Sequence, residues 1–225
     1  VHPARFYVGV QQPSRSVVKV GETVTAHFAA VFTNGKPMSG AKLKARLERV
    51  DHHQTARVAG EGTDGEPKVE VDNHEVKKQM QTCEVVTKRG QASCKFEVRT
   101  PGEYRVRVWG RDKSGRDVQA GYTFRASGDD AAAWPRYERA RIDVVADKAE
   151  YAPGDVAKLI VESPFKVATG LLTIEQDGVQ SARLFNINND TPALEVPITA
   201  EMAPNVYASV VLTRGRIHNE KDATG

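Results

Sequence analysis

Apolar and polar residues alternate along most of this chain, and this period-two pattern is the strongest constraint on its fold. Between Thr23 and Thr33 apolar side chains occupy every second position, and the same pattern recurs from Phe96 to Val98 and from Tyr104 to Val108. Strands with one buried and one solvated face have this period. No window long enough for an amphipathic helix carries an i, i+3, i+4, i+7 stripe, although residues 72–79 are compatible with one or two helical turns. The sequence therefore predicts an all-β protein.

The second half of the chain repeats the strand-and-turn pattern of the first. Val20-Gly21-Glu22 precedes a long predicted strand, and Pro153-Gly154-Asp155 precedes its counterpart in the second half. Between the halves, residues 125–133 are small and polar, as in an exposed connection. The 225 residues suffice for two domains of about 100 residues each. We expect two tandem Ig-like antiparallel β-sandwiches at residues 1–126 and 137–225, with a linker at residues 127–136.

Charge and hydropathy exclude several classes of partner. The 32 basic and 29 acidic side chains are mixed along the sequence and leave a net charge of +3, so no block of one sign indicates nucleic acid or an anionic membrane. No apolar stretch approaches the roughly 20 residues that cross a bilayer. The start of the chain, Val1-His2-Pro3-Ala4-Arg5, has neither an initiator Met nor a signal sequence. We expect a processed chain or an excised fragment that makes no contact with a membrane.

Cys83 and Cys94 are the only two cysteines in the chain. Two cysteines cannot complete a zinc site, so the alternatives are one disulfide or two buried free thiols. If Lys88-Arg89 is the tip of a hairpin, Cys83 lies opposite Cys94, where Cα atoms about 4.5 to 5.5 Å apart suit a disulfide. We expect the disulfide, and with it an oxidising compartment.

One cluster of residues has the chemistry of metal ligands: His52, His53 and His74, with Asp51, Asp72 and Glu75 near them. Adjacent side chains on a strand point to opposite faces, so His52 and His53 cannot bind one ion without a bulge. We therefore interpret these histidines as solvated loop residues and expect no metal. Motifs for nucleophilic catalysis, for calcium loops and for phosphate-binding glycine loops are all missing from the sequence. We expect no enzyme activity and no cofactor.

Two further segments have competing interpretations. Residues 52–82 are polar and include Arg57, Lys77 and Lys78, so they form either a loop that meets a protease or partner, or a pair of edge strands with an extended turn. We favour the strands. Trp134 and Tyr137 stand just before the first strand of the second domain, and large aromatic side chains gain most from burial. We expect both at the interdomain contact; the alternative is that Trp134 covers the base of its own sandwich.

Four ordered blocks of the second half resemble the macroglobulin-like domains of bacterial α2-macroglobulins. They are Asp147 to Ala157, Ser163-Pro164-Phe165, Leu171 to Glu175, and Ala203 to Arg216. The first half resembles the preceding macroglobulin-like domain through the segment from Cys83 to Cys94 and through Pro101 to Val106. The resemblance covers nearly the whole chain and implies two consecutive macroglobulin-like domains.

This resemblance implies a structural part of a periplasmic, broad-spectrum protease trap. In that family a protease cuts a bait segment, the domains rearrange, and a thioester formed within a Cys-x-Glu-Gln motif captures the protease. Neither Cys83 nor Cys94 lies in such a motif, and the bait-bearing domain is expected after Gly215-Arg216. The implied partners are neighbouring domains of the full-length protein and, through it, target proteases. The resemblance also allows a lipid anchor to the inner membrane in the full-length protein.

A second functional hypothesis is an Ig-like binding module of a secreted or cell-surface adhesin or enzyme. Aromatic residues make up 7% of the chain and show no cluster of Trp and Tyr, which argues against stacking on sugars. The structural part of a protease trap is the leading hypothesis.

Overall fold

The computed structural model describes residues 4–61, 67–135 and 141–214, and within them the secondary structure is almost entirely β. The strands before the linker are β1 (Phe6–Val10), β2 (Val17–Lys19), β3 (Thr23–Phe32), β4 (Lys42–Glu61), β5 (Pro67–Val86), β6 (Gln91–Glu97), β7 (Gly102–Arg111) and β8 (Asp117–Ser127). After the linker come β9 (Val144–Ala146), β10 (Val156–Val161), β11 (Val167–Gln176), β12 (Gly178–Asn188), β13 (Ala193–Pro197), the 3-10 turn η1 (Ala200–Met202) and β14 (Tyr207–Thr213).

The first eight strands form one β-sandwich. A five-stranded sheet in the order β2-β8-β7-β4-β5 covers a three-stranded sheet in the order β1-β3-β6. Every described pairing is antiparallel except β2 with β8, which is parallel. The alternating apolar residues of both sheets meet in one core, whose largest fully buried members include Tyr104, Phe96, Phe124 and Leu47. The period-two pattern therefore reflects the burial of one face of these strands in a shared core, as expected from the sequence.

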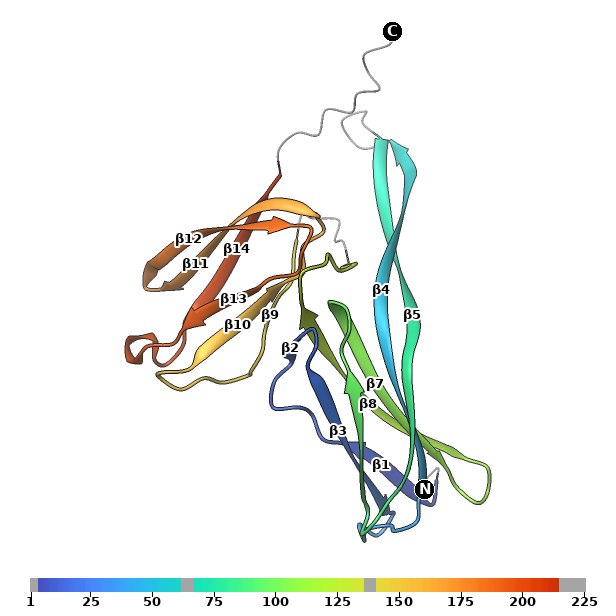
Figure 1. Cartoon of the computed structure of the whole chain (residues 1–225). Coiled ribbons are helices and arrows are strands. Elements are labelled where there is room, and N and C mark those ends of the chain that lie inside the picture. The colour runs from blue at the N-terminus through green and yellow to red at the C-terminus, as the bar shows by residue number, and fades with distance from the viewer. Residues whose placement is uncertain (1–3, 62–66, 136–140, 215–225) are drawn as a thin grey trace.

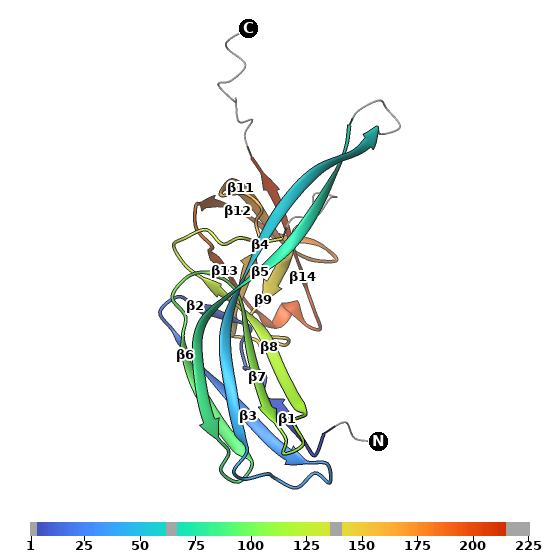
Figure 2. The same cartoon turned by 90° about the vertical axis from the view of Figure 1, so that its right-hand side faces the viewer.

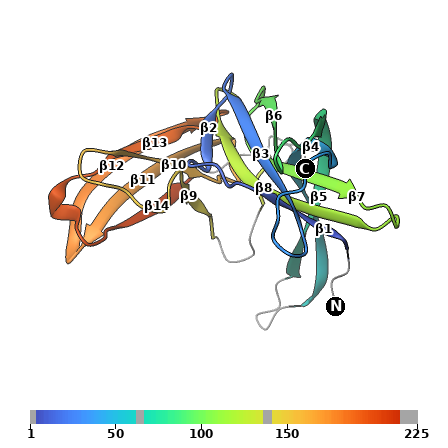
Figure 3. The same cartoon turned by 90° about the horizontal axis from the view of Figure 1, so that it is seen from below.

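The last six strands form a second, smaller sandwich. The sheet β13-β10-β9 packs on the sheet β12-β11-β14 around a core that contains Leu159, Val161, Leu172 and Ile174. The two sandwiches lie side by side, with the second beside the β2 end of the first (Figures 1 and 3). The prediction of an all-β fold built from antiparallel sandwiches is confirmed.

β4 and β5 are much longer than the sheet to which they belong. β7 pairs with β4 only from Leu43 to Val50, and beyond that point β4 and β5 continue as a two-stranded ribbon (Figures 1 and 2). Residues 52–61 and 67–82 thus lie in two long strands, as favoured from the sequence. The suggestion of helical turns at residues 72–79 is wrong, because each of these residues lies in β5 against β4, for example Glu75 opposite His52.

A disulfide joins Cys83 to Cys94, but not across a hairpin. Cys83 lies in β5 at the edge of the five-stranded sheet, and Cys94 lies in β6 at the edge of the three-stranded sheet. The turn residues are Arg89 and Gly90, both with positive φ, and Lys88 faces Gln91. The predicted tip at Lys88-Arg89 and the direct cross-strand register are therefore wrong. The strands diverge after the turn, and the disulfide spans the two sheets with a Cα–Cα distance of 6.2 Å.

The side chain of Gln81 joins the same two edges. Its amide nitrogen donates to the carbonyl oxygen of Glu97 at 2.6 Å, and its amide oxygen accepts from the N–H of Glu97 at 3.1 Å. A primary amide has the donor and acceptor of a peptide group, so Gln81 replaces one missing pair of backbone hydrogen bonds. On this side of the sandwich, the edges of the two sheets are therefore joined by the disulfide and by the two hydrogen bonds of the Gln81 side chain.

We predict that the Cys83→Ala/Cys94→Ala double variant folds but loses about 2 to 3 kcal/mol of unfolding free energy, because closing a loop of this length restricts the unfolded chain by that amount. Urea denaturation followed by circular dichroism measures the difference. Gln81→Ala serves as a comparison and is expected to cost about 1 kcal/mol. An unchanged denaturation midpoint for the double cysteine variant would contradict this stabilising role.

Candidate interdomain interface

The two sandwiches meet at a small apolar cluster around Trp134. The Trp134 side chain is 4% exposed and packs with Val17 of β2 and Ile160 of β10, which are 2% and 0% exposed, and with Ala132. Val17 belongs to the first sandwich and Ile160 to the second, so the indole ring contacts both. Tyr137, the other aromatic residue expected here, lies outside the described residues.

β10 explains why this contact forms. Leu159 and Val161 face the core of the second sandwich, and Ile160, between them, belongs to the Trp134 cluster. A strand that buries both faces cannot alternate between apolar and polar residues. The consecutive Leu159-Ile160-Val161 is thus a sequence signal for the interface, and the period-two pattern does not contain it.

Polar contacts join the sandwiches directly on either side of the cluster. The Ser16 amide donates to the carbonyl of Asp147 and its hydroxyl donates to the carbonyl of Ala146, both at 2.6 Å. Arg125 of β8 donates from Nε to Oε1 of Glu162 at 2.9 Å, and the Glu162 side chain is only 2% exposed. Ser16, Arg125 and Glu162 do not belong to a sequence motif, because their hydrogen-bond partners lie in the other half of the chain.

Glu162 has a raised pKa in this interface. Burial raises the pKa of its carboxyl group above the ordinary 4.5, Arg125 partly lowers it, and the neighbouring charges of Asp143 and Glu103 raise it again. A carboxyl group of this kind contributes stability below its ordinary pKa, and that contribution is lost as the pH rises through the folded-state pKa. Arg125 therefore stabilises the ionised form of the buried Glu162 side chain.

Thr191 ties the connecting segment to the second sandwich. Gly128 and Thr191 exchange backbone hydrogen bonds at 3.0 and 2.9 Å, and the Thr191 hydroxyl bonds to Asp130 and Ala132 at 3.0 and 3.1 Å. The expectation that residues 125–133 are an exposed connection is wrong for Arg125 to Ser127, which complete β8, and Ala126 is fully buried. The small side chains permit close packing rather than free movement.

The three histidines with metal-ligand chemistry lie in strands and not in a loop, so that expectation is wrong, and His52 is held by partners in the first sandwich and the connecting segment. His52 Nε2 lies 3.0 Å from Glu103 Oε2, and the backbone N–H of His52 donates to Ala133 at 3.2 Å, next to the Trp134 cluster. His53 and His74 face each other across the ribbon and are exposed. Among the residues described, no three His, Cys, Asp or Glu side chains are grouped as ligands for a metal ion.

The nearby acidic residues make ion pairs with basic side chains. Asp51 lies 2.8 Å from Arg49 and 2.9 Å from Lys78. Although burial raises the pKa of Asp51, the hydrogen bonds from these two cations lower it by more, so the pKa lies below its usual 3.8. Glu75 pairs with Lys77 at 3.4 Å, and Asp72 is exposed on the ribbon. These contacts fix where the ribbon leaves the sheet.

The two β-sandwiches match two family models. The family model for bacterial macroglobulin domain 6 matches residues 9–128, more than half of the chain, and the model for the alpha-2-macroglobulin bait region domain matches residues 142–221. The chain therefore belongs to the α2-macroglobulin family.

Curated relatives carry the same family name. The chain is 24% identical over 213 residues to an alpha-2-macroglobulin homolog of Nostoc sp., which covers 94% of this chain and 11% of that protein. It is 29% identical over 136 residues to an alpha-2-macroglobulin of Ralstonia nicotianae, which covers 56% of this chain and 8% of that protein. The chain thus spans about a tenth of the length of the relatives that it matches.

Solved structures of α2-macroglobulins also align with the chain. The native conformation of the Escherichia coli protein gives a TM-score of 0.47 at 17% identity, covering 95% of this chain and 14% of that one. The Salmonella protein reacted with methylamine gives a TM-score of 0.40 at 18% identity, covering 93% and 15%.

One expectation about the family is corrected by these matches. The bait-bearing domain was expected after Gly215-Arg216, and the second sandwich was expected to be an ordinary macroglobulin-like domain. The bait region model instead matches residues 142–221, which include the second sandwich. The strand pattern does not distinguish the two kinds of domain, because both give the same alternation. Separately, the described residues contain no helix with the length and apolar character needed to cross a membrane.

We predict that Trp134→Ala broadens the distribution of distances between the sandwiches, because the ring contacts Val17 and Ile160 together. Small-angle X-ray scattering of the 225-residue chain measures this distribution. Trp109→Ala is the matched control, since Trp109 lies on the first sandwich under the guanidinium of Arg46 and away from the cluster. A scattering profile that Trp134→Ala leaves unchanged would show that another contact holds the two sandwiches.

We predict that Arg125→Leu destabilises the protein by about 3 to 5 kcal/mol at pH 8, because it leaves Glu162 charged and buried without its cation. The loss shrinks toward pH 4.5, where Glu162 is protonated in the variant. Denaturation at the two pH values measures the difference. Arg125→Leu/Glu162→Gln, which removes both charges, is expected to restore most of the stability at pH 8. Equal destabilisation at both pH values would rule out a dominant charge effect.

Proposed function

We propose that this chain contributes two consecutive domains to a protease-trapping α2-macroglobulin. The observation that carries the proposal is the order of the two family matches: a domain 6 model over residues 9–128 is followed directly by a bait region domain model over residues 142–221. The first sandwich holds the bait region domain at a defined position, and target proteases reach it in the full-length protein. The chain acts as a structural component of an inhibitor and not as an enzyme.

The joint supports this structural role. Trp134, Val17 and Ile160 are nearly inaccessible to solvent, and the ion pair between Arg125 and Glu162 adds a directional contact. Domains that meet only through a polar linker change their relative orientation freely, whereas buried apolar and charged contacts restrict it. When a bait region domain is held in this way, a movement of that domain also moves the neighbouring domain.

The outer face of the second sandwich supports contact with neighbouring domains. Leu171 lies in register with Leu184 of β12 and Val211 of β14, and these side chains are 37%, 73% and 60% exposed. Exposed apolar rows of this kind are typical of surfaces that another domain covers. The matched region is 11% and 8% of the two curated relatives, so most of such a protein lies outside this chain.

Covalent capture would require residues outside this chain. Cys83 and Cys94 are joined in a disulfide, and neither lies in a Cys-x-Glu-Gln motif. The disulfide is consistent with an oxidising compartment, and we place the full-length protein in the periplasm. A lipid anchor on the full-length protein would be compatible with this location.

We predict that the 225-residue chain forms no covalent adduct with trypsin or elastase and leaves their peptidase activity unchanged. In the full-length protein, limiting amounts of the same proteases are expected to cut first within or beside residues 142–221. Denaturing gels and N-terminal sequencing of the products give both results. A first cut elsewhere in the full-length protein, with no protease retained, would overturn the proposed trap. Binding of the chain to a glycan array would then favour the alternative of an Ig-like binding module.

A further inference from the structure

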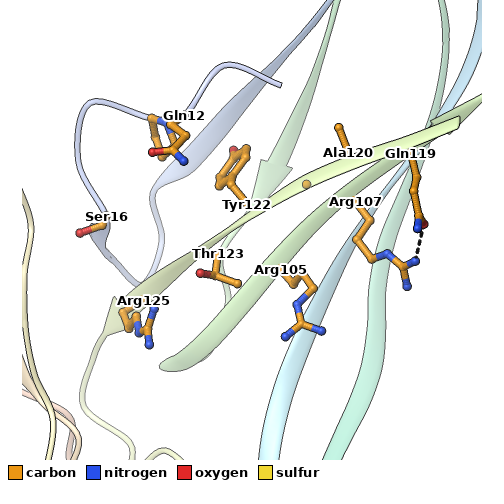
Figure 4. Close-up of a pocket in the computed structure, with 11 residues that line it drawn as sticks. Gln12, Ser16, Arg105, Arg107, Gln119, Ala120, Tyr122, Thr123 and Arg125 are labelled. Atoms are coloured by element: carbon orange, nitrogen blue, oxygen red, sulfur yellow. Dashed lines mark hydrogen bonds between the residues drawn. The ribbon is translucent and has the colours of Figure 1, made fainter. Parts of the chain in front are cut away.

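A groove runs along the open edge of β8, on the side of the first sandwich opposite the disulfide. It has a volume of about 760 Å³ and lies between β8 and the segment that connects β1 to β2 (Figure 4). Its lining includes Gln12, Ser16, Arg105, Arg107, Tyr122 and Thr123. The groove does not include Trp134, although Ser16 and Arg125 of its lining also contact the second sandwich, and its floor is a strand edge.

The edge of β8 offers backbone hydrogen-bonding groups to this groove. β2 pairs with β8 only at Arg125, Ala126 and Ser127. The Arg125 amide donates to Ser16, and so it points away from β7. Alternate residues of an antiparallel strand direct their N–H and C=O groups to the same side, which places those of Thr123 and Gly121 at the groove. Both residues are exposed, and within the described residues neither has a strand partner on that side.

The groove is positively charged. Three arginines and no acidic residue occur among the described residues that line it. Arg125 is neutralised by Glu162, and Arg105 lies 3.6 Å from Glu75. Arg107 donates to the side-chain oxygen of Gln119 at 2.8 Å, and within the described residues it has no acidic partner.

The register of β7 and β8 places two of these arginines on the outer face of the sheet, beside small residues of β8. Arg107 lies opposite Gly121 and Arg105 lies opposite Thr123, and Figure 4 shows both arginine side chains on the face of the sheet away from Tyr122 and Gln12. Position 121 has no room for a side chain, because a Cβ there would lie 2.6 Å from the carbonyl oxygen of Val106. The two arginines are two residues apart on one strand face, which corresponds to about 6.6 to 6.8 Å.

A buried hydroxyl group in the groove also lacks a partner. Tyr122 is 7% exposed, and its hydroxyl makes no hydrogen bond among the described residues. Its ring lies between β8 and Gln12 (Figure 4). Buried hydroxyl groups are normally hydrogen-bonded, so an oxygen acceptor supplied by a ligand would satisfy this one.

We propose that the β8 edge binds an extended, acidic polypeptide segment from outside this chain, which adds to the five-stranded sheet as a further strand. The backbone of the segment pairs with Gly121 and Thr123. Acidic side chains two residues apart on the segment match the spacing of Arg105 and Arg107. Main-chain pairing gives affinity in this mode of recognition, and the alternate side chains give specificity. Binding of such a segment at the β8 edge is independent of the proposed role in protease trapping.

The test uses the ¹⁵N-labelled 225-residue chain and the synthetic peptide acetyl-Thr-Val-Glu-Val-Glu-Val-Thr-amide. At saturating peptide we expect the amide protons of Gly121 and Thr123 to exchange with solvent at least about tenfold more slowly, because strand addition places them in hydrogen bonds. The same peptide with Lys in place of both Glu is expected to give no protection. Protection of these two amides by the acidic peptide alone supports the proposal.

Variants separate the charge contribution from folding. Arg105→Gln/Arg107→Gln is expected to weaken the peptide affinity at least about tenfold. Arg111→Gln is the matched control on the same face of β7, since Arg111 pairs with Asp117 at 2.7 Å outside the groove, and it is expected to change the affinity less than about twofold. Thermal midpoints check that both variants fold.

Three results would overturn the proposal. They are absence of peptide binding, binding that leaves the exchange of Gly121 and Thr123 unchanged, and equal binding of the acidic and basic peptides. If a sulfated oligosaccharide bound at Arg105 and Arg107 while the acidic peptide gave no amide protection, the groove would be an anion site and not a strand-addition site.

Discussion

The exclusion of water from the joint between the sandwiches is the constraint on which the rest of the arrangement depends. Ile160 and Val17 are buried together with Trp134 and belong to neither sandwich core. The same closure buries Glu162, whose charge is stabilised by Arg125 only while the two sandwiches stay in place. Apolar burial and the ion pair therefore reinforce each other, since separating the sandwiches would expose the apolar residues and disrupt the ion pair together.

The strand edges on the two sides of the first sandwich differ in whether they are covered. On one side the disulfide and Gln81 join the edges of the two sheets, and these contacts prevent further strands from pairing there. On the other side, among the described residues, the edge of β8 has no strand partner before Arg125. Open edges invite pairing with other chains and are usually protected by charge or by a covering segment. Arg105 and Arg107 give this edge a charge that repels basic segments and attracts acidic ones.

Local patterns predicted most of the strands, while contacts between distant residues determined the interface. The alternation from Thr23 to Phe32 and the strand that follows Pro153-Gly154-Asp155 could be read from the sequence, because both strands bury apolar residues. The cysteine pair was also predictable, but its position between two sheets was not, since the divergence of β5 and β6 depends on their different partners. Ser16, Arg125 and Glu162 were missed because hydrogen-bond partners more than thirty residues away leave no spacing to detect. Ile160 was detectable, since it interrupts the alternation of β10.

The central claim is that the buried joint makes the two sandwiches one rigid unit in solution. Residual dipolar couplings of backbone amides in the wild-type chain test it most directly, because each sandwich reports its own alignment tensor. A rigid joint predicts that residues 6–127 and 144–213 give the same tensor in magnitude and orientation when fitted to the structure separately. Tensors of clearly different magnitude would show that the sandwiches reorient independently, and this would contradict the account.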